Sequence, residues 1–371
     1  MSAKMPIVLV CAGGGGVGKT TSAAALALAL ARTGWRTLVV TIDPARRLAD
    51  AMGVELGNGV QIVRIDPRTD DRLLALMPEP AGATRIFMEY LFEEEPEALA
   101  RLLSNQLFLT LEDKLVGMSE LVAMSLVLRA IETSNLDVVV VDTAPSRYAL
   151  DFLTYPTRLS SLLEGRAVKW LGNLASRAEG EDTRASRFSS WGRRRVEAAI
   201  GAVLGVSLVR DTTHLFAEIS LVRKRFADIA AQLGKLLLGK GARYLLVAAP
   251  TGAAQADVEF LLERIESLHK PPLAVLLNRS DLKSQEWSRV LRNAPESTPA
   301  ILDALMHLEA ERESRLAAAS AFATHLAVDH VGLLRIPLPL VEAVEPVDIV
   351  SALADELEPF LTQLTGLKPN H

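Results

Sequence analysis

The sequence predicts a doubly wound α/β fold, in which helices cover both faces of a mainly parallel sheet. Three observations support this prediction. Short runs of almost wholly apolar residues alternate with stretches of helix-forming residues, as expected for a parallel sheet that is buried on both faces. A glycine-rich segment joins the first apolar run to the first predicted helix. The chain has 371 residues, of which 49% are hydrophobic, and it can therefore bury a large core.

Seven apolar runs are predicted to be the strands of this sheet. In chain order they are residues 7–12, 37–42, 60–65, 137–142, 244–249, 273–278 and 332–336. About 70 residues separate the third run from the fourth, and about 100 separate the fourth from the fifth, which is far more than one crossover helix needs. The ranges 70–135 and 151–240 are therefore predicted to be helical insertions that form a helical subdomain within one domain spanning residues 1–371.

The composition argues against several classes of partner. The net charge is −5, so no overall positive field would attract nucleic acid or anionic lipid. Uncharged apolar windows such as residues 198–209 are shorter than the ~20 residues that cross a bilayer, and the first residues lack the apolar stretch of a signal peptide. We therefore expect a cytoplasmic protein that is not integral to a membrane. The single cysteine, Cys11, excludes an internal disulfide and a cysteine-based zinc site within one chain.

Residues 11–21, CAGGGGVGKTT, match the phosphate-binding P-loop pattern G-x-x-x-x-G-K-[ST]. A predicted strand precedes them and a predicted helix follows, whereas a flexible linker would have neither flank. Glycines let backbone N–H groups turn toward phosphate oxygens, and the helix N-terminus directs its positive dipole end at the same charge. Lys19 is then expected to reach the β- and γ-phosphates of ATP, and the Thr20 hydroxyl to bind Mg²⁺. The predicted nucleotide contacts are Gly13, Gly14, Gly15, Gly16, Val17, Gly18, Lys19, Thr20 and Thr21.

Two aspartates follow predicted strands at the same edge of the sheet. Asp142 ends the run VVVVD, the position of a carboxylate that holds Mg²⁺ through water, and Pro145 follows in a loop beside the γ-phosphate. Asp43 ends the second strand, where a carboxylate can orient and polarise the attacking water. Either residue alone could be an ordinary loop or capping aspartate. Together, beside a P-loop, they favour metal binding for Asp142 and catalysis for Asp43.

Four segments of the chain read GGGGVGKTT, TIDPARRLADAMG, VVDTAPSRYALDFL and LLNRS. Together they resemble the ArsA-type ATPases, the family that contains the arsenite-pump ATPase and the ATPases that guide tail-anchored membrane proteins. The resemblance extends from the P-loop to the last strand. It implies a sheet of the deviant Walker A class of P-loop NTPases, which hydrolyses ATP and dimerises face to face with nucleotide at the interface.

The resemblance also assigns roles to residues. The aspartate of the D-P-A motif, here Asp43, activates water in that family, and the aspartate of D-T-A-P, here Asp142, belongs to the second switch. The asparagine that ends a late strand, here Asn278, reads adenine. The segment around Pro337 is expected to close over the base.

The chain departs from the family at the P-loop. The family pattern is G-K-G-G-V-G-K-T, and its first lysine neutralises charge at the partner's phosphates as the transition state forms. Here that position is Gly14. Arg46, Arg47 and Arg147 occupy switch positions where relatives of the pump type carry His, Ser and Gly. Any of the three could replace the lysine, although a solvated or salt-bridged arginine is an equal alternative. The chain also has no cysteine cluster to hold arsenite, which argues against arsenite efflux.

Two functions are consistent with the sequence. The first is a dimeric, ATP-hydrolysing protein whose nucleotide state drives a conformational change, with a hydrophobic or membrane protein as its client. The second is a weakly hydrolysing regulatory subunit that pairs with a lysine-bearing paralogue. In the guiding ATPases the insertions form a methionine-rich groove, and this chain has Met77, Met88, Met118 and Met124 in its first insertion. Core packing is the alternative role for these methionines. The sequence leaves open the client and the choice between homodimer and heterodimer.

Overall fold

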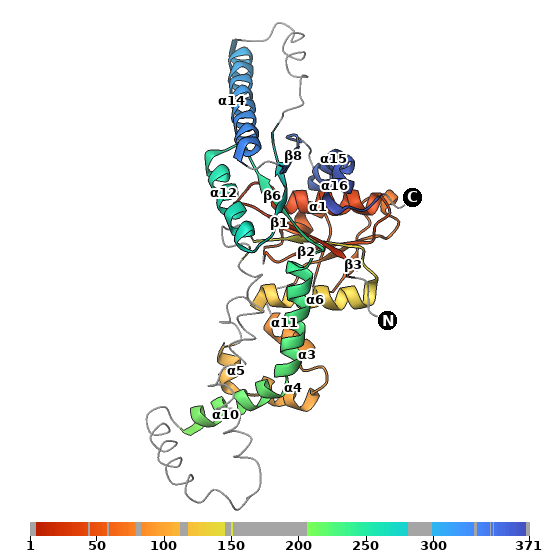
Figure 1. Ribbon diagram of the computed structural model, residues 1–371, viewed down its shortest axis with the longest axis vertical. Helices are drawn as coiled ribbons and strands as arrows, with labels where there is room; N and C mark the ends of the chain where they lie inside the picture. The colour runs from red at the N-terminus through yellow and green to blue at the C-terminus, as the bar shows by residue number, and fades with distance from the viewer. Residues whose placement is uncertain are drawn as a thin grey trace, which may run out of the picture. The chain divides into compact units, whose positions relative to one another are not determined.

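The computed structural model describes residues 5–43, 45–57, 59–78, 83–111, 118–144, 150, 206–280, 299–329, 332–341, 343 and 345–368. The chain divides into two compact units (Figure 1). We call Met1–Glu79, Arg129–Asp151 and Leu236–His371 the sheet unit, and Pro80–Leu128 and Phe152–Lys235 the helical unit. Both stretches of the helical unit fall inside the ranges 70–135 and 151–240 that were predicted as insertions.

The sheet unit contains eight strands in the order β3-β4-β2-β5-β1-β6-β7-β8. Their bounds are β1 (Ile7–Ala12), β2 (Thr37–Thr41), β3 (Gln61–Ile62), β4 (Leu73–Leu76), β5 (Val138–Asp142), β6 (Ala242–Ala248), β7 (Pro272–Leu277) and β8 (Leu334–Pro337). All neighbours pair in parallel except β3 with β4. The predicted mainly parallel α/β fold is therefore confirmed. The chain leaves the adjacent strands β1 and β6 toward opposite sides of the sheet, and such a switch point opens a crevice at the carboxyl ends of the strands.

Helices cover this sheet because β1, β2, β4 and β5 are buried on both faces along almost their whole length. The described helices of the sheet unit are α1 (Lys19–Arg32), α2 (Arg47–Met52), α12 (Gly252–Ser267), α14 (Pro299–Asp329), α15 (Pro346–Leu357) and α16 (Leu361–Thr365), with 3-10 turns η1 (Pro67–Thr69) and η4 (Glu358–Phe360). Helix α1 consists mostly of Ala and Leu, strong helix formers, and it packs against α2 and α15 (Figure 1). Gly34, with φ of 92°, follows its end in the left-handed conformation that favours glycine.

The helical unit holds α3 (Ala83–Leu91), α4 (Pro96–Leu103), α5 (Gln106–Leu111) and α10 (Val206–Leu221), with most of α6 (Met118–Ser134) and α11 (Arg223–Leu238). The rings of Phe87 and Phe226 meet edge to face with centroids 6.1 Å apart. Arg101 of α4 forms an ion pair with Glu218 of α10. The unit is thus packed through both aromatic and ionic contacts. Among the described helices of the chain, none combines the length and the apolar character that crossing a membrane requires.

Two strands differ from the sequence prediction. β4 was not predicted, and it lies inside the first predicted insertion, so the prediction that this insertion begins at residue 70 was wrong. Its sequence, LLAL, is a short buried run of helix-favouring residues that carries no strand periodicity. The predicted strand 60–65 shrinks to β3, two exposed residues that pair antiparallel with β4. The adjacent Val63 still reaches β4 through its backbone, since its N–H donates to the Leu73 carbonyl.

Candidate functional site

The P-loop lies between β1 and α1, where the pattern placed it. Gly16 and Gly18 have φ of 71° and 87°, in the left-handed region that favours glycine. A Cβ at Gly13 would lie 2.3 Å from the Val247 carbonyl oxygen, so the loop also passes too close to β6 for any larger residue. Helix α1 begins at Lys19 without a side-chain cap. Its first N–H groups therefore remain available for an anion.

Lys19, Thr20 and Asp142 meet beneath this loop. The Lys19 Nζ donates to the Gly14 carbonyl oxygen at 2.7 Å. Asp142 Oδ2 accepts hydrogen bonds from the hydroxyls of Thr20 at 2.8 Å and Thr41 at 3.1 Å. Parallel pairing of β1 with β5 sets Cys11 beside Asp142, which fixes this carboxylate next to the start of the loop. Three predicted residues, two from the start of α1 and one from the end of β5, are thus brought together.

Burial shapes the electrostatics of these groups. Burial lowers the pKa of Lys19, the nearby carboxylates of Asp142 and Asp43 oppose that shift, and the charge of Arg47 adds to it. Burial raises the pKa of Asp142 to about 6, against the hydrogen bonds from Thr20 and Thr41. Asp142 is fully buried, and its Oδ1 has no hydrogen-bond partner among the residues that the structure describes.

These residues fit a magnesium ion. Mg²⁺ takes oxygen ligands, usually one or two from the protein with water and phosphate oxygens completing the shell. The Thr20 hydroxyl and the Asp142 carboxylate are two such oxygens in contact with each other. A buried carboxylate oxygen without a partner is costly unless a cation or a donor satisfies it. The orphaned Oδ1 is therefore the observation that supports a metal here.

Asp43 follows β2 and is also buried. Its Oδ1 accepts from the Ala45 N–H at 3.1 Å, and its Oδ2 accepts from Arg47 Nη1 at 3.0 Å. The Asp43 N–H donates to Thr41 Oγ1 at 3.1 Å, and Thr41 in turn donates to Asp142. Thr41 thereby joins the predicted catalytic carboxylate to the predicted metal ligand. Thr41 was not among the predicted site residues. It is the last residue of β2 and lies directly opposite Asp142 in the pairing of β2 with β5.

Gly14, where the family pattern has a lysine, faces a carboxylate. A Cβ at Gly14 would lie 2.2 Å from Oδ2 of Asp257, which lies on α12. A larger residue at position 14 therefore requires the Asp257 side chain to move. Of the three arginines that were considered as replacements, Arg47 binds Asp43 and Arg46 is an exposed residue at the N-cap of α2. Arg147 lies outside the described residues, as does Pro145.

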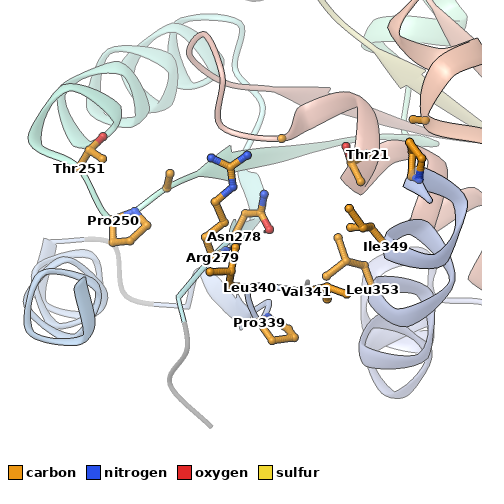
Figure 2. Close-up of a pocket in the computed structure, with 14 residues that line it drawn as sticks. Thr21, Pro250, Thr251, Asn278, Arg279, Pro339, Leu340, Val341, Ile349 and Leu353 are labelled. Atoms are coloured by element: carbon orange, nitrogen blue, oxygen red, sulfur yellow. Dashed lines mark hydrogen bonds between the residues drawn. The ribbon is translucent and has the colours of Figure 1, made fainter. Parts of the chain in front are cut away.

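A cavity of about 450 Å³ adjoins the P-loop (Figure 2). Its lining is Gly18, Thr21, Ala51, Ala249, Pro250, Thr251, Asn278, Arg279, Pro339, Leu340, Val341, Pro346, Ile349 and Leu353. Asn278 lines it as predicted for a base-reading residue, and its Nδ2 donates to the Val17 carbonyl at 2.9 Å. Pro337 is the last residue of β8, and the wall of the cavity is built from residues two to four positions further on.

Comparison with known proteins finds similarity over part of the chain. Residues 5–184 match the family model described as Anion-transporting ATPase, of the ArsA type. The ATPase get3 of Aspergillus terreus is 32% identical over 134 residues, which are 36% of this chain and 38% of that protein. The ATPase GET3 of Ajellomyces dermatitidis is 26% identical over 203 residues, which are 55% of this chain and 53% of that protein. The match thus spans about two fifths to half the length of these curated relatives. With the P-loop, Asp43 and Asp142 at the carboxyl edge of one sheet, the chain is similar to the ArsA-type ATPases over residues 5–184.

Proposed function

We propose that this protein binds MgATP and hydrolyses it to ADP and phosphate. One observation carries the proposal: the Lys19 ammonium, the Thr20–Asp142 pair and the Asp43 carboxylate converge beneath one glycine loop, beside a cavity of about 450 Å³. That volume lies within the range of small-ligand sites. The similarity of residues 5–184 to the Anion-transporting ATPase family model supports the same activity.

Binding would use both ends of the site. The triphosphate oxygens would accept hydrogen bonds from the N–H groups of the loop and of the first turn of α1. The Lys19 ammonium, which now donates to the Gly14 carbonyl, would donate to phosphate oxygens instead. The adenine would enter the cavity beside Asn278, against the apolar wall formed by Pro339, Leu340 and Val341. The hydrogen bond between Asn278 and Val17 couples the two ends, because it ties the end of β7 to the loop.

Hydrolysis would depend on the two aspartates. Thr20 and Asp142 would hold the Mg²⁺, which polarises phosphate oxygens and offsets their charge when it is bound. Asp43 would accept a hydrogen bond from the attacking water and take its proton as the water oxygen bonds to the γ-phosphorus. The Thr41 hydroxyl fixes Asp43 relative to Asp142, and so fixes the water relative to the metal site.

The resemblance to the family supports a dimer with nucleotide at its interface and a hydrophobic client protein for the helical unit. The methionines that were predicted to line a groove do not support a hydrophobic client, because those whose side chains are described are buried. Met77 is only 4% exposed and lies in the core of the sheet unit, while Met88 and Met124 are buried as well. The side chain of Met118 lies outside the described residues.

A weakly hydrolysing regulatory subunit is the second candidate function. The observation that favours it is the position of Asp257, whose carboxylate occupies the space beside Gly14 that a lysine side chain would have to enter. A lysine-bearing paralogue would then supply the missing charge across a shared interface.

The first test is calorimetric titration of the full-length protein with MgATP. The Lys19→Ala variant should lose tight binding, because the buried ammonium can no longer meet the β- and γ-phosphates. Lys240→Ala is the matched control, since this lysine is exposed at the end of the loop before β6. Lys240→Ala should bind as the unmodified protein does. Binding of MgATP by Lys19→Ala at the unmodified affinity would reject the P-loop as the nucleotide site.

A further inference from the structure

The ion pair between Arg47 and Asp43 stands in the way of the proposed chemistry. A carboxylate that orients water needs an oxygen that can accept from it and a negative charge that can polarise it. In this structure Oδ1 of Asp43 accepts from the Ala45 N–H, and Oδ2 accepts from the Arg47 guanidinium. The guanidinium competes with water for Oδ2 and offsets its charge. Oδ2 can still accept from water beside the guanidinium, but the shared charge polarises that water less, so opening the ion pair would strengthen the action of Asp43 on water.

The exposure of the two partners shows which one can move. The Asp43 side chain is 8% exposed and is held by its neighbours, whereas the Arg47 side chain is 56% exposed. Arg47 is the first residue of α2, and the fully buried Leu48 and Met52 anchor this helix in the core. An ion pair with one exposed partner contributes little to stability. The guanidinium can therefore swing off Asp43 while α2 stays in place.

The contacts of Asp43 place this guanidinium near the P-loop. Asp43 donates to Thr41, Thr41 donates to Asp142, and Asp142 accepts from Thr20 of the loop. A triphosphate in the loop would bring several negative charges beside Arg47, and a guanidinium binds phosphate oxygens in a two-pronged geometry that a single carboxylate oxygen cannot match. The loop itself provides no second cation, since position 14 is glycine.

We propose that Arg47 moves from Asp43 to the γ-phosphate of bound ATP, which frees Asp43 and supplies the charge that Gly14 lacks. The proposal rests on the proposed ATPase function. The water oxygen then bonds to the γ-phosphorus, the bond from phosphorus to the β–γ bridging oxygen breaks, and the water proton passes to Asp43. Arg47 keeps its protons throughout and offsets negative charge on the phosphoryl oxygens. One residue would thus act both as a latch on the base and as the charge-neutralising group.

The test compares Arg47→Ala and Arg47→Lys with the neighbouring control Arg46→Ala in the full-length protein. We measure kcat, the Kd for MgATP, and the Kd for MgADP with aluminium fluoride, a mimic of the transferring phosphoryl group. Arg47→Ala should lower kcat about 100-fold and weaken the aluminium fluoride complex by a similar factor, with the Kd for MgATP changed less than about threefold. Arg47→Lys should recover part of both losses. Arg46→Ala should change neither.

Three results would overturn the inference. An unchanged kcat in Arg47→Ala would show that the guanidinium does nothing in hydrolysis, and a raised kcat would show that it is only a latch. An equal loss in Arg46→Ala would remove the assignment to position 47. If Arg47→Ala does not fold, Arg47→Lys and Arg47→Gln give the same comparison. Failure of the proposed function looks different, because the unmodified protein would then not hydrolyse ATP at all.

Discussion

The two ends of the candidate site are built in different ways. At the phosphate end, the hydroxyls of Thr20 and Thr41 bind the Asp142 carboxylate, and the Lys19 ammonium binds the Gly14 carbonyl of the loop. At the base end, the cavity wall is mostly apolar and comes from segments as far apart as the P-loop and α15 (Figure 2). Electrostatic preorganisation acts on the transition state, whereas apolar contact with a base binds substrate and transition state equally. Changes at the phosphate end should therefore lower kcat, and changes at the base end should raise KM.

The largest effect is expected at Asp43. Asp43→Asn keeps the shape of the side chain and removes its basicity, so kcat should fall by about 100-fold or more while MgATP binding is retained. Single-turnover hydrolysis and calorimetry on the same preparation measure the two quantities. Asp50→Asn, an exposed position on α2, is the control. If kcat of Asp43→Asn equals that of the unmodified protein, the catalytic base must be sought at another residue.

The next effect concerns Asp142 in the nucleotide-free protein. Its pKa is about 6 in the folded protein and 3.8 ordinarily, so the folded state binds this proton more tightly than the unfolded chain does. The free energy of unfolding is therefore expected to fall as the pH rises from about 4 to about 6, and the deficit persists above that range. Asp142→Asn removes the buried charge and keeps an oxygen for Thr20 and Thr41.

Thermal unfolding of Asp142→Asn checks this expectation. At pH 8 the variant should melt a few degrees above the unmodified protein, and near pH 4 the difference should vanish because the unmodified carboxyl is protonated there too. The same variant should lose the additional stabilisation that MgATP gives the unmodified protein over ATP with EDTA. A lower Tm at pH 8 without ligand would contradict the view that this carboxylate is kept at a cost to stability.

A smaller effect is expected at Gly14. Because we assign the missing charge to Arg47, Gly14→Lys should change kcat by less than about threefold in the unmodified background. The backbone at Gly14 is outside the left-handed region, but the Asp257 carboxylate must move to admit a side chain. In the Arg47→Ala background, Gly14→Lys combined with Asp257→Ala should restore hydrolysis about tenfold. Strong activation by Gly14→Lys alone would show that Arg47 does not neutralise charge on the γ-phosphate, and it would favour the regulatory-subunit function.

The last effect belongs to the base end. Val341→Ala removes two carbons from the apolar wall of the cavity; because this side chain is only half-buried, we expect about half of the ~1.6 kcal/mol for two methylenes, which should raise KM for ATP about fourfold with kcat unchanged. Ile62→Ala, which removes a partly exposed aliphatic side chain from β3 far along the sheet, is the control. A fall in kcat with constant KM would contradict the claim that the base end affects binding and the phosphate end affects catalysis.

The same contrast explains what the sequence could predict. The P-loop and Asp142 are recognisable because glycine spacing and a strand end are local patterns, and the apolar runs predict most of the strands. The contact between Gly14 and Asp257 joins residues 243 positions apart through the packing of α12, and no spacing rule reports it. The cavity wall at Pro339 to Val341 and in α15 is likewise fixed only when β8 pairs with β7. The Arg47–Asp43 ion pair could be predicted only in part. The sequence shows its i, i+4 spacing, but the contact itself depends on how the chain turns between β2 and α2.

Single-turnover hydrolysis by the pure full-length protein tests the central claim most directly. Enzyme in excess over radiolabelled ATP, with Mg²⁺ in one arm and EDTA in the other, reports the chemical step without product release. We predict that the unmodified protein converts bound ATP to ADP and phosphate in the Mg²⁺ arm, that EDTA stops this, and that Lys19→Ala shows no conversion in either arm. ATP that stays bound and intact in the Mg²⁺ arm would contradict an ATPase complete within one chain.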